Sequence, residues 1–275
     1  MPTQAEKAAV FQALHQGPEV LVVGNPWDVG TARILTGLGF AALSTTSAGL
    51  AFTLGRRDGT ASVTRDEALA NAKSIVEATH LPVAGDLENG YGDSPETVAE
   101  TIRQAGTAGL VGGSIEDTTG NPREPIYDFQ RAVDRVAAAV TAARGLRFPF
   151  MLVARAENYL YGRPDLDDTI KRLKAFEAAG ADVLYAPGIT EPEVIRKVCA
   201  AVEKPVNVLM GMKGAVPLSV KELGALGVRR ISVGSGFARA ALTAFLHAAR
   251  EVHDDGTFTF NERTLYISEL ADLFA

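Results

Sequence analysis

The chain has 275 residues, of which 47% are hydrophobic and 22% charged, and its formal net charge is −6. This mild acidity excludes the Lys/Arg excess that binding to a nucleic-acid backbone requires, and Cys199, the single cysteine, excludes an intrachain disulfide. The longest apolar runs fall short of the ~18 residues of a membrane span, and residues 1–7 are too polar for a secretory signal, so we expect a cytoplasmic protein with neither nucleic-acid nor membrane partners.

Short apolar runs alternate with helix-like segments along the chain. The expected strands are residues 20–23, 40–43, 81–84, 110–115, 150–154, 182–185, 205–209 and 230–233. The expected helices are residues 4–15, 29–38, 65–79, 95–107, 127–144, 166–179, 191–202, 219–226 and 237–252, followed by an amphipathic segment at 261–274. Such alternation predicts a parallel sheet covered by helices.

Eight strand–helix units in this length predict a closed (β/α)₈ barrel of the TIM type, an α/β fold, with a doubly wound sheet as the alternative. We expect one domain over residues 1–275, of which 253–275 form a C-terminal helical extension.

Two carboxylates stand directly after the third expected strand, in the run Val83-Ala84-Gly85-Asp86-Leu87-Glu88-Asn89-Gly90-Tyr91-Gly92. The i, i+2 spacing of Asp86 and Glu88 puts both side chains on one face of an extended backbone. Their mutual repulsion raises both pKa values unless a cation lies between them, and a divalent ion with oxygen ligands would remove it. The alternative is a solvated acidic loop.

The other expected strands also end in polar residues, and in barrels the chemistry lies at these ends. The ring comprises Asp28, Thr45, Thr46, Ser47, Asp86, Glu88, Glu116, Asp117, Arg155, Glu157, Tyr185, Asn207 and Ser235. Oxygen ligands from neighbouring strands favour Mg²⁺, or Mn²⁺, over Zn²⁺. The planar fork of Arg155 suits a substrate carboxylate, although it could simply neutralise Glu157 or Glu116.

Four motifs make the chain resemble the isocitrate lyase/phosphoenolpyruvate mutase superfamily over nearly its full length. They are Leu54-Gly55-Arg56-Arg57-Asp58, Asp86-Leu87-Glu88-Asn89-Gly90-Tyr91-Gly92, Ser114-Ile115-Glu116-Asp117 and Ala154-Arg155-Ala156-Glu157. The resemblance implies a Mg²⁺-dependent barrel that makes or breaks C–C or P–C bonds beside a 2-oxo or enolpyruvyl carboxylate. It also implies a dimer or tetramer that exchanges the eighth helix.

The resemblance carries roles onto this sequence. Asp86 matches the direct metal ligand, and Asp58, Glu88 and Glu116 match groups that hold the waters of the metal. Thr45, Thr46 and Ser47 fall where relatives bind substrate oxygens. The expected catalytic set is Asp58, Glu116 and Arg155, and the expected substrate contacts are Thr45, Thr46, Ser47, Asp86, Arg155 and Asn207.

Three departures from the sequence patterns of the superfamily limit the activities that we expect of this chain. Glu88 stands where relatives usually have Asp. The loop at residues 118–125 reads Thr-Thr-Gly-Asn-Pro-Arg-Glu-Pro, without the Lys-Lys/Arg-Cys-Gly-His sequence of isocitrate and methylisocitrate lyases. Phosphonomutases have Lys and Asn in this loop and usually His after strand six, whereas here Asn121 and Arg123 are the stand-ins and strand six ends in Tyr185.

The resulting hypothesis is a Mg²⁺-dependent lyase that cleaves a C–C bond of a small 2-oxo dicarboxylic acid, as an oxaloacetate decarboxylase does, through a metal-stabilised enolate. One alternative is P–C chemistry on a phosphonopyruvate-like substrate, by a mutase or a hydrolase. Another is non-catalytic binding of a 2-oxo acid.

Overall fold

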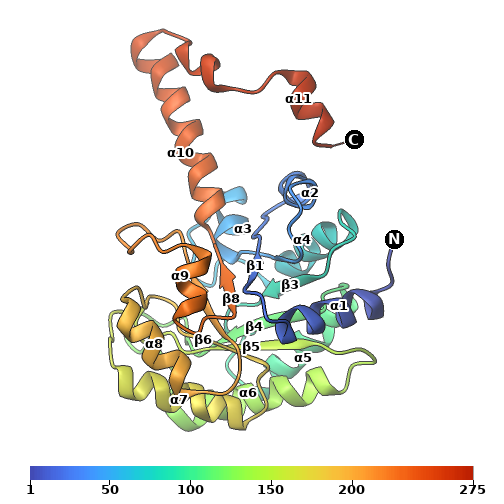
Figure 1. Ribbon diagram of the computed structural model, residues 1–275, viewed down its shortest axis with the longest axis vertical. Helices are drawn as coiled ribbons and strands as arrows, with labels where there is room; N and C mark the ends of the chain where they lie inside the picture. The colour runs from blue at the N-terminus through green and yellow to red at the C-terminus, as the bar shows by residue number, and fades with distance from the viewer. Residues whose placement is uncertain (275) are drawn as a thin grey trace.

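Eight parallel strands pair in the order β1-β8-β7-β6-β5-β4-β3-β2. The strands are β1 (Leu21–Val23), β2 (Leu43–Ser44), β3 (Val83–Asp86), β4 (Gly112–Glu116), β5 (Met151–Arg155), β6 (Val183–Tyr185), β7 (Val206–Leu209) and β8 (Arg230–Ser232). A bridge between Gly24 and Leu43 joins the two end strands and closes the barrel. The computed structural model describes residues 1–274 (Figure 1).

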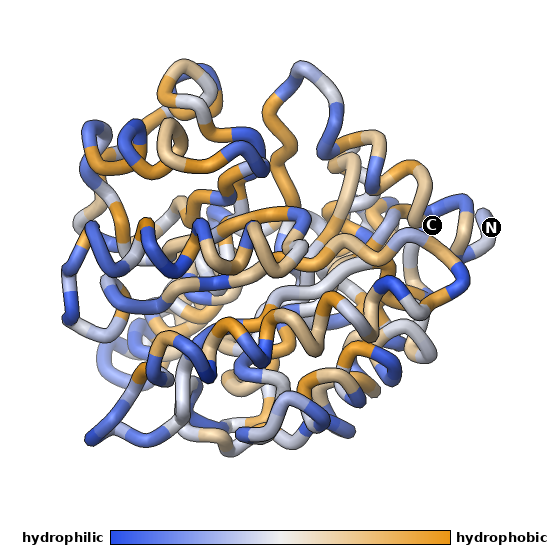
Figure 2. Tube along the Cα trace, turned by 90° about the horizontal axis from the view of Figure 1, so that it is seen from below, coloured by the Kyte–Doolittle hydropathy of each residue, from blue (hydrophilic) through white to orange (hydrophobic). Residues whose placement is uncertain are grey.

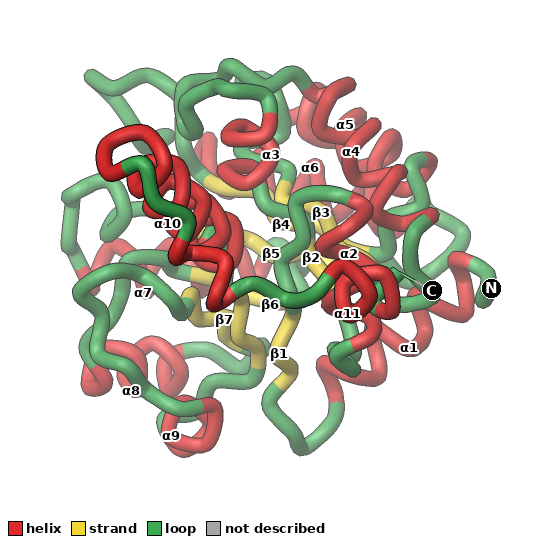
Figure 3. Tube along the Cα trace, turned by 90° about the horizontal axis from the view of Figure 1, so that it is seen from above, coloured by secondary structure: helices red, strands yellow, loops and turns green. Residues whose placement is uncertain are grey.

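Helices surround this barrel when it is seen from above (Figure 3). They are α1 (Gln4–Gln16), α2 (Val29–Gly37), α3 (Ser47–Thr53), α4 (Arg65–Glu77), α5 (Pro95–Thr107), α6 (Phe129–Arg144), α7 (Leu166–Ala178), α8 (Pro192–Ala201), α9 (Val220–Ala225) and α10 (Gly236–Arg250). Then follow a π-helical turn η1 (Glu251–Asp255), a 3₁₀ helix η2 (Thr259–Arg263) and α11 (Ile267–Asp272). The predicted (β/α)₈ barrel is therefore confirmed.

Two local features differ from the expected elements. β2 begins at Leu43, three residues later than expected, because Gly39 has a φ of +84° and the Phe40 amide donates to the carbonyl of Leu35, so that this stretch still belongs to the turn leaving α2. The connection after β2 contains α3, which we had not predicted. The Thr46 side chain caps it by accepting from the Gly49 amide.

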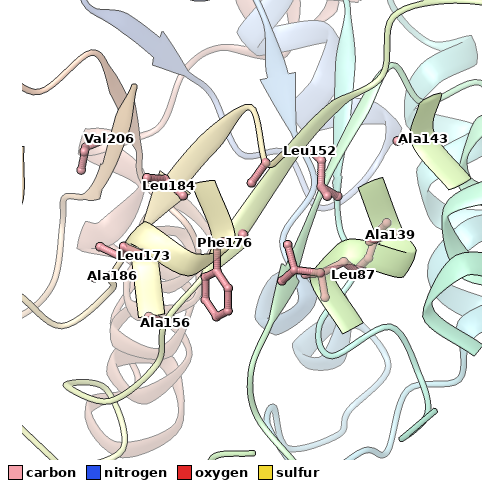
Figure 4. Close-up of a cluster of buried hydrophobic side chains, with 14 of the residues drawn as sticks. Leu87, Ala139, Ala143, Leu152, Ala156, Leu173, Phe176, Leu184, Ala186 and Val206 are labelled. Atoms are coloured by element: carbon pink, nitrogen blue, oxygen red, sulfur yellow. The ribbon is translucent and has the colours of Figure 1, made fainter. Parts of the chain in front are cut away.

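Among residues 1–274, two large hydrophobic clusters and a small one of Leu50, Ala51 and Val63 make up the core. The largest lies between the strands and the surrounding helices, where Leu152, Leu173, Phe176 and Leu184 pack together (Figure 4). The second fills the lower barrel interior, and Phe11 of α1 closes it from below. The outermost turns are largely hydrophilic (Figure 2). Because the lower interior is filled with apolar side chains, polar chemistry is restricted to the upper half and rim of the barrel.

The C-terminal part leaves the barrel. Helix α10 rises away from it, and the chain then folds back so that α11 lies above α2 (Figures 1 and 3). Three large apolar side chains of α10 are exposed, namely Leu242, Phe245 and Leu246. The expected extension at 253–275 thus contains η2 and α11, while Ala275 lies outside the described residues. Among residues 1–274, no helix has the length and apolarity needed to cross a membrane.

Candidate functional site

Asp86 ends β3 on the carboxyl rim of the barrel, where neighbouring elements fix its carboxylate. Oδ2 accepts from the Ser47 amide at 3.0 Å, and Oδ1 lies 3.1 Å from Nη1 of Arg155. The Asp86 amide in turn donates to the Thr45 hydroxyl at 2.9 Å. Since both carboxylate oxygens and the backbone are held, the direction of this side chain is set by the fold.

Arg155 ends β5 and lies at the centre of three ion pairs. Besides Asp86, it contacts Oε2 of Glu116 at 3.2 Å and Oε1 of Glu157 at 2.6 Å. Glu157 has no exposed surface, and burial raises the pKa of its carboxyl group. The guanidinium also lies over the Tyr185 ring, 5.0 Å from its centroid. Arg155 therefore neutralises these carboxylates, which is one of the two roles left open by the sequence, and its contact with a substrate stays a prediction.

Glu88 extends the negative charge beyond the reach of Arg155. Burial and the charges of Asp86, Glu116 and Asp58 raise its pKa to about 8. Glu88 has a φ of +46°, a left-handed conformation that is uncommon for residues other than glycine. Its acidic neighbours Asp86 and Glu116 both form ion pairs with Arg155, whereas the Glu88 carboxylate has no such basic partner among the described residues. This part of the site is therefore short of positive charge.

Asp58 lies on the exposed connection between α3 and α4, outside the strands. Loss of hydration and the charge of Asp86 raise its pKa, whereas a hydrogen bond with Ser47 lowers it. Glu116, at the end of β4, accepts from the Thr118 hydroxyl at 2.7 Å. The structure thus brings the four expected metal-binding carboxylates to one side of the rim, although their roles remain predictions.

The three hydroxyl residues after β2, Thr45 to Ser47, differ in their contacts and in their exposure to solvent. Thr45 holds the Asp86 amide, and Thr46 caps α3. Both side chains are buried, while Ser47 is half-buried and uses its amide to bind Asp86. The Thr46 hydroxyl, one of the expected substrate contacts, is used instead to cap the N-terminus of α3.

A small cavity of about 50 Å³ continues from the rim into the barrel. Asp86, Arg155, Tyr185, Asn207 and Arg230 contribute to its wall. Asn207 donates to the Ser232 hydroxyl at 2.9 Å, and its Oδ1 is buried without a partner. Asn25 also lines this cavity.

Asn25 is a structural residue of the rim that the sequence analysis missed. Its Oδ1 accepts from the amides of Val233 and Gly234, and its Nδ2 donates to the carbonyls of Ser44 and Thr45. It thereby ties the ends of β8 and β2 together across β1. Its position directly after the first strand was the available signal, whereas Asp28, which we had placed on the rim, caps α2 instead.

A network of buried hydrogen bonds and ion pairs holds the residues and loops of the site in place. Asp117 accepts from the Glu157 amide at 2.9 Å and pairs with Arg172 at 3.0 Å. Arg135, which is 1% exposed, donates to backbone carbonyls at Asn89, Gly92 and Asp93 and so holds the loop that follows Glu88. Asp117 therefore has a positioning role, and it lies off the reactive surface.

The loop after β4 is closed by a bridge between Thr118 and Ile126. Asn121 and Arg123, the stand-ins for phosphonomutase residues, are exposed there, and the Asn121 side chain accepts from the Arg123 amide. The amide oxygen of Asn121 is thus already engaged within the loop.

The donor set fits a hard divalent cation held largely through water. All candidate donors are oxygens, and the negative charge around Glu88 exceeds what Arg155 can neutralise. Within the described residues, however, no three His, Cys, Asp or Glu side chains converge closely enough to form a direct ligand cluster. Few direct protein ligands and several retained waters are typical of Mg²⁺.

Comparisons with known proteins agree with the barrel fold. The family model for phosphoenolpyruvate phosphomutase matches residues 11–253. A solved structure from Burkholderia cenocepacia, described provisionally as a lyase/mutase, is 56% identical with a TM-score of 0.95, and the match covers 99% of this chain and 96% of that one.

Several relatives have named activities, and two of them differ in the reaction named. The 2-methylisocitrate lyase of Escherichia coli is 30% identical over 201 residues, which are 70% of this chain and 67% of the relative. The oxaloacetate decarboxylase of Bradyrhizobium diazoefficiens is 30% identical over 203 residues, which are 71% of this chain and 68% of the relative. Lyase and mutase chemistry thus both occur among proteins similar to this chain.

Proposed function

Because the chain belongs to the phosphoenolpyruvate phosphomutase family, we propose that it is a Mg²⁺-dependent lyase that cleaves a C–C bond of a small 2-oxo dicarboxylic acid, with oxaloacetate decarboxylation as the favoured reaction. The observation that carries the proposal is the fixed pair of Asp86 and Arg155 at the mouth of a small polar cavity. Similarity to an oxaloacetate decarboxylase supports the choice of reaction.

The all-oxygen rim would hold the metal through Asp86, with Asp58, Glu88 and Glu116 holding its waters. When bound, Mg²⁺ would supply Lewis acidity toward the 2-oxo oxygen of the substrate. The side chains described here supply orientation and charge. Cleavage of the C–C bond needs stabilisation of negative charge and no acid at the carbon that loses CO₂, which suits a loop at residues 118–125 without cysteine. The resulting enolate would then take a proton from water at that carbon to give pyruvate.

Arg155 would stabilise the negative charge that develops on the substrate oxygen, because its guanidinium is held rigidly and partly shielded from water. Ser47, whose amide binds Asp86 and whose side chain forms a hydrogen bond with Asp58, would contact a substrate carboxylate through its hydroxyl. Glu157 and Asp117 would keep Arg155 and its loop in place. Asn207 would contact the part of the substrate that enters the cavity.

Oxaloacetate turnover tests the proposal. Purified protein is assayed with Mg²⁺ and again after chelation, and pyruvate is measured against the background caused by the metal alone. Asp86→Asn should reduce the rate to that background while the circular dichroism spectrum stays unchanged. Asp167→Asn, in the exposed first turn of α7, is the matched control and should keep full activity.

Two outcomes would replace the proposal. New phosphorus resonances from phosphonopyruvate would indicate P–C chemistry, the activity suggested by the name of the family model. Thermal stabilisation by 2-oxo acids without any product would indicate a binding protein.

We further propose that the chain forms a homo-oligomer by exchanging α10. Leu242, Phe245 and Leu246 are exposed on that helix, and an apolar hollow of about 760 Å³ lies at the outer face of β1, lined in part by Val22 and Phe40. Burial of these faces against a second copy would remove both from water. Light scattering should give a mass of two or four chains, and Phe245→Glu should shift it toward the monomer; a monomeric wild type would disprove the exchange.

A further inference from the structure

Arg230, at the start of β8, is a buried cation without a counter-charge. It is 4% exposed, and its Nε and Nη1 atoms have no hydrogen-bond partner. It takes part in none of the ion pairs formed by residues 1–274. By contrast, the buried guanidinium groups of Arg155 and Arg172 both face carboxylates. An unpaired charge in a protein interior is strongly unfavourable, so this arrangement calls for a missing partner.

The neighbouring side chains do not supply one. The Phe11 ring lies 5.9 Å from the guanidinium carbon, near the limit of cation–π attraction. Burial and the charge of Arg230 lower the pKa of His15 to about 4, so His15 is neutral at physiological pH. Burial also raises the pKa of Tyr185, which keeps its phenol protonated. None of these groups replaces the lost hydration of a guanidinium.

Arg230 lines the interior cavity, and that cavity has room for a ligand. Its volume of about 50 Å³ corresponds to roughly three to five water-sized groups, at ~10–15 Å³ each. Asp86 is an acidic residue of the wall, and Arg155 already neutralises it. The positive charge of Arg230 is therefore uncompensated within a space that can hold a small anion but not a bulky one.

Asn207 adds a second group without a partner on the same wall. Its Nδ2 donates to the Ser232 hydroxyl, and its Oδ1 is buried and unpaired. A half-turn of the amide would keep the bond to Ser232, because a hydroxyl can donate as well as accept. It would also leave Nδ2, in place of Oδ1, as the unpaired group of this cavity-lining residue, available as a donor. Arg230 and Asn207, which are register partners on β8 and β7, could thus bind one anion together.

We propose that Arg230, assisted by Asn207, binds a small monovalent anion, either a carboxylate or a halide, inside the barrel. The ligand has two sources. It is either a carboxylate of the bound substrate, in which case the inference rests on the function proposed above, or a free anion from solution.

Thermal unfolding at constant ionic strength tests the site without any catalytic readout. Sodium bromide progressively replaces a bulky sulfonate salt such as sodium 2-(N-morpholino)ethanesulfonate. The midpoint of the wild type should rise with bromide concentration, by mass action. Arg230→Met should remove this dependence. Arg229→Met, which removes the neighbouring exposed arginine, should retain it. Equal midpoints in both salts, or the same bromide dependence in Arg230→Met, would overturn the proposal.

Crystals of the wild type grown in bromide provide a test that does not depend on the variants folding. An anomalous peak within hydrogen-bond distance of the Arg230 guanidinium is expected, and its absence would refute the site. Steady-state kinetics then assign the source of the anion.

If the ligand is a substrate carboxylate, bromide competes and Arg230→Met raises KM about tenfold or more. If it is a free anion, bromide leaves KM unchanged. A protein that turns over no substrate would refute the lyase proposal, while the thermal shift would still decide the anion site.

Discussion

Replacing Glu88 by glutamine should stabilise the metal-free protein. The carboxylate of Glu88 is half-buried beside Asp86, Asp58 and Glu116, and these neighbours together with burial raise its pKa to about 8 from an ordinary value of 4.5. Glutamine keeps nearly the same shape and removes the charge. The substitution therefore isolates the electrostatic cost of the acidic rim from its packing.

The magnitude follows from the pKa difference. Raising the pKa of Glu88 from 4.5 to about 8 corresponds to about 5 kcal/mol of free energy of unfolding, since each pKa unit is worth about 1.36 kcal/mol. Below pH 4.5 Glu88 is protonated in both states and contributes nothing. Between pH 4.5 and 8 the unfolded chain loses its proton while the folded chain retains it, so stability falls as pH rises. Because the half-buried carboxylate can move toward water, the expected gain from Glu88→Gln at pH 7.5 is about 2–3 kcal/mol.

Urea unfolding followed by circular dichroism measures this gain. Wild type, Glu88→Gln and the exposed control Glu203→Gln are compared at pH 5 and pH 7.5 in chelator, and again with Mg²⁺. The advantage of Glu88→Gln should be largest at pH 7.5 in chelator and should shrink with Mg²⁺, which stabilises the wild type by binding its folded state. If Glu88→Gln were no more stable than wild type in chelator at pH 7.5, the description of an under-neutralised rim would be wrong.

Three further predictions concern single residues. Arg155→Gln should lower the free energy of unfolding by about 3–5 kcal/mol, because it leaves the fully buried Glu157 without its cation; urea titration measures the loss, and a change below about 1 kcal/mol would contradict the ion-pair geometry. The pKa of His15 is lowered to about 4, so its contribution to stability is complete above pH 6.5 and decreases by about 3 kcal/mol as pH falls to 4; His15→Phe should flatten that part of the pH profile, and an unchanged profile would disprove it. Cys199→Ser should leave oxaloacetate turnover unchanged, because burial raises the pKa of the thiol to about 11 and the side chain lies on α8, away from the site; loss of turnover in a folded variant would assign it a role.

Much of the barrel could be predicted from the sequence because its strands are short apolar runs with polar ends. Asp86, Glu116 and Arg155 were recognised in this way, each as a polar residue that directly follows a buried run. Their arrangement on one rim then follows from parallel pairing, which aligns the carboxyl ends of neighbouring strands. The positions were predictable for this reason, and so were the pairs of Arg155 with Glu116 and Glu157, whereas the pair of Arg155 with Asp86 was not.

The missed features depend on tertiary contacts. Helix α3 begins in a run of hydroxyl residues that also suits a turn, and only the capping bond from Gly49 to Thr46 distinguishes the two. Asn25 has its role because three strand ends come within reach of one amide. Arg230 lies at the start of a strand, where an arginine is usually solvated, and its burial follows from the closure of the barrel around it. Sequence spacing carries no information on these contacts.

The distribution of charge bears on the choice between the two chemistries. The rim carries an excess of carboxylates around Glu88, whereas the interior cavity carries the uncompensated Arg230. A dianionic phosphonate that remained on the rim would add to the repulsion there, beyond what one divalent ion and Arg155 neutralise. A dicarboxylate could instead direct one carboxylate toward the cavity. Loss of the other as neutral CO₂ would leave its electron pair on the 2-oxo side, beside Arg155, where positive charge is held in place. The charge distribution therefore favours C–C cleavage, and the bromide competition experiment tests the step on which this argument depends.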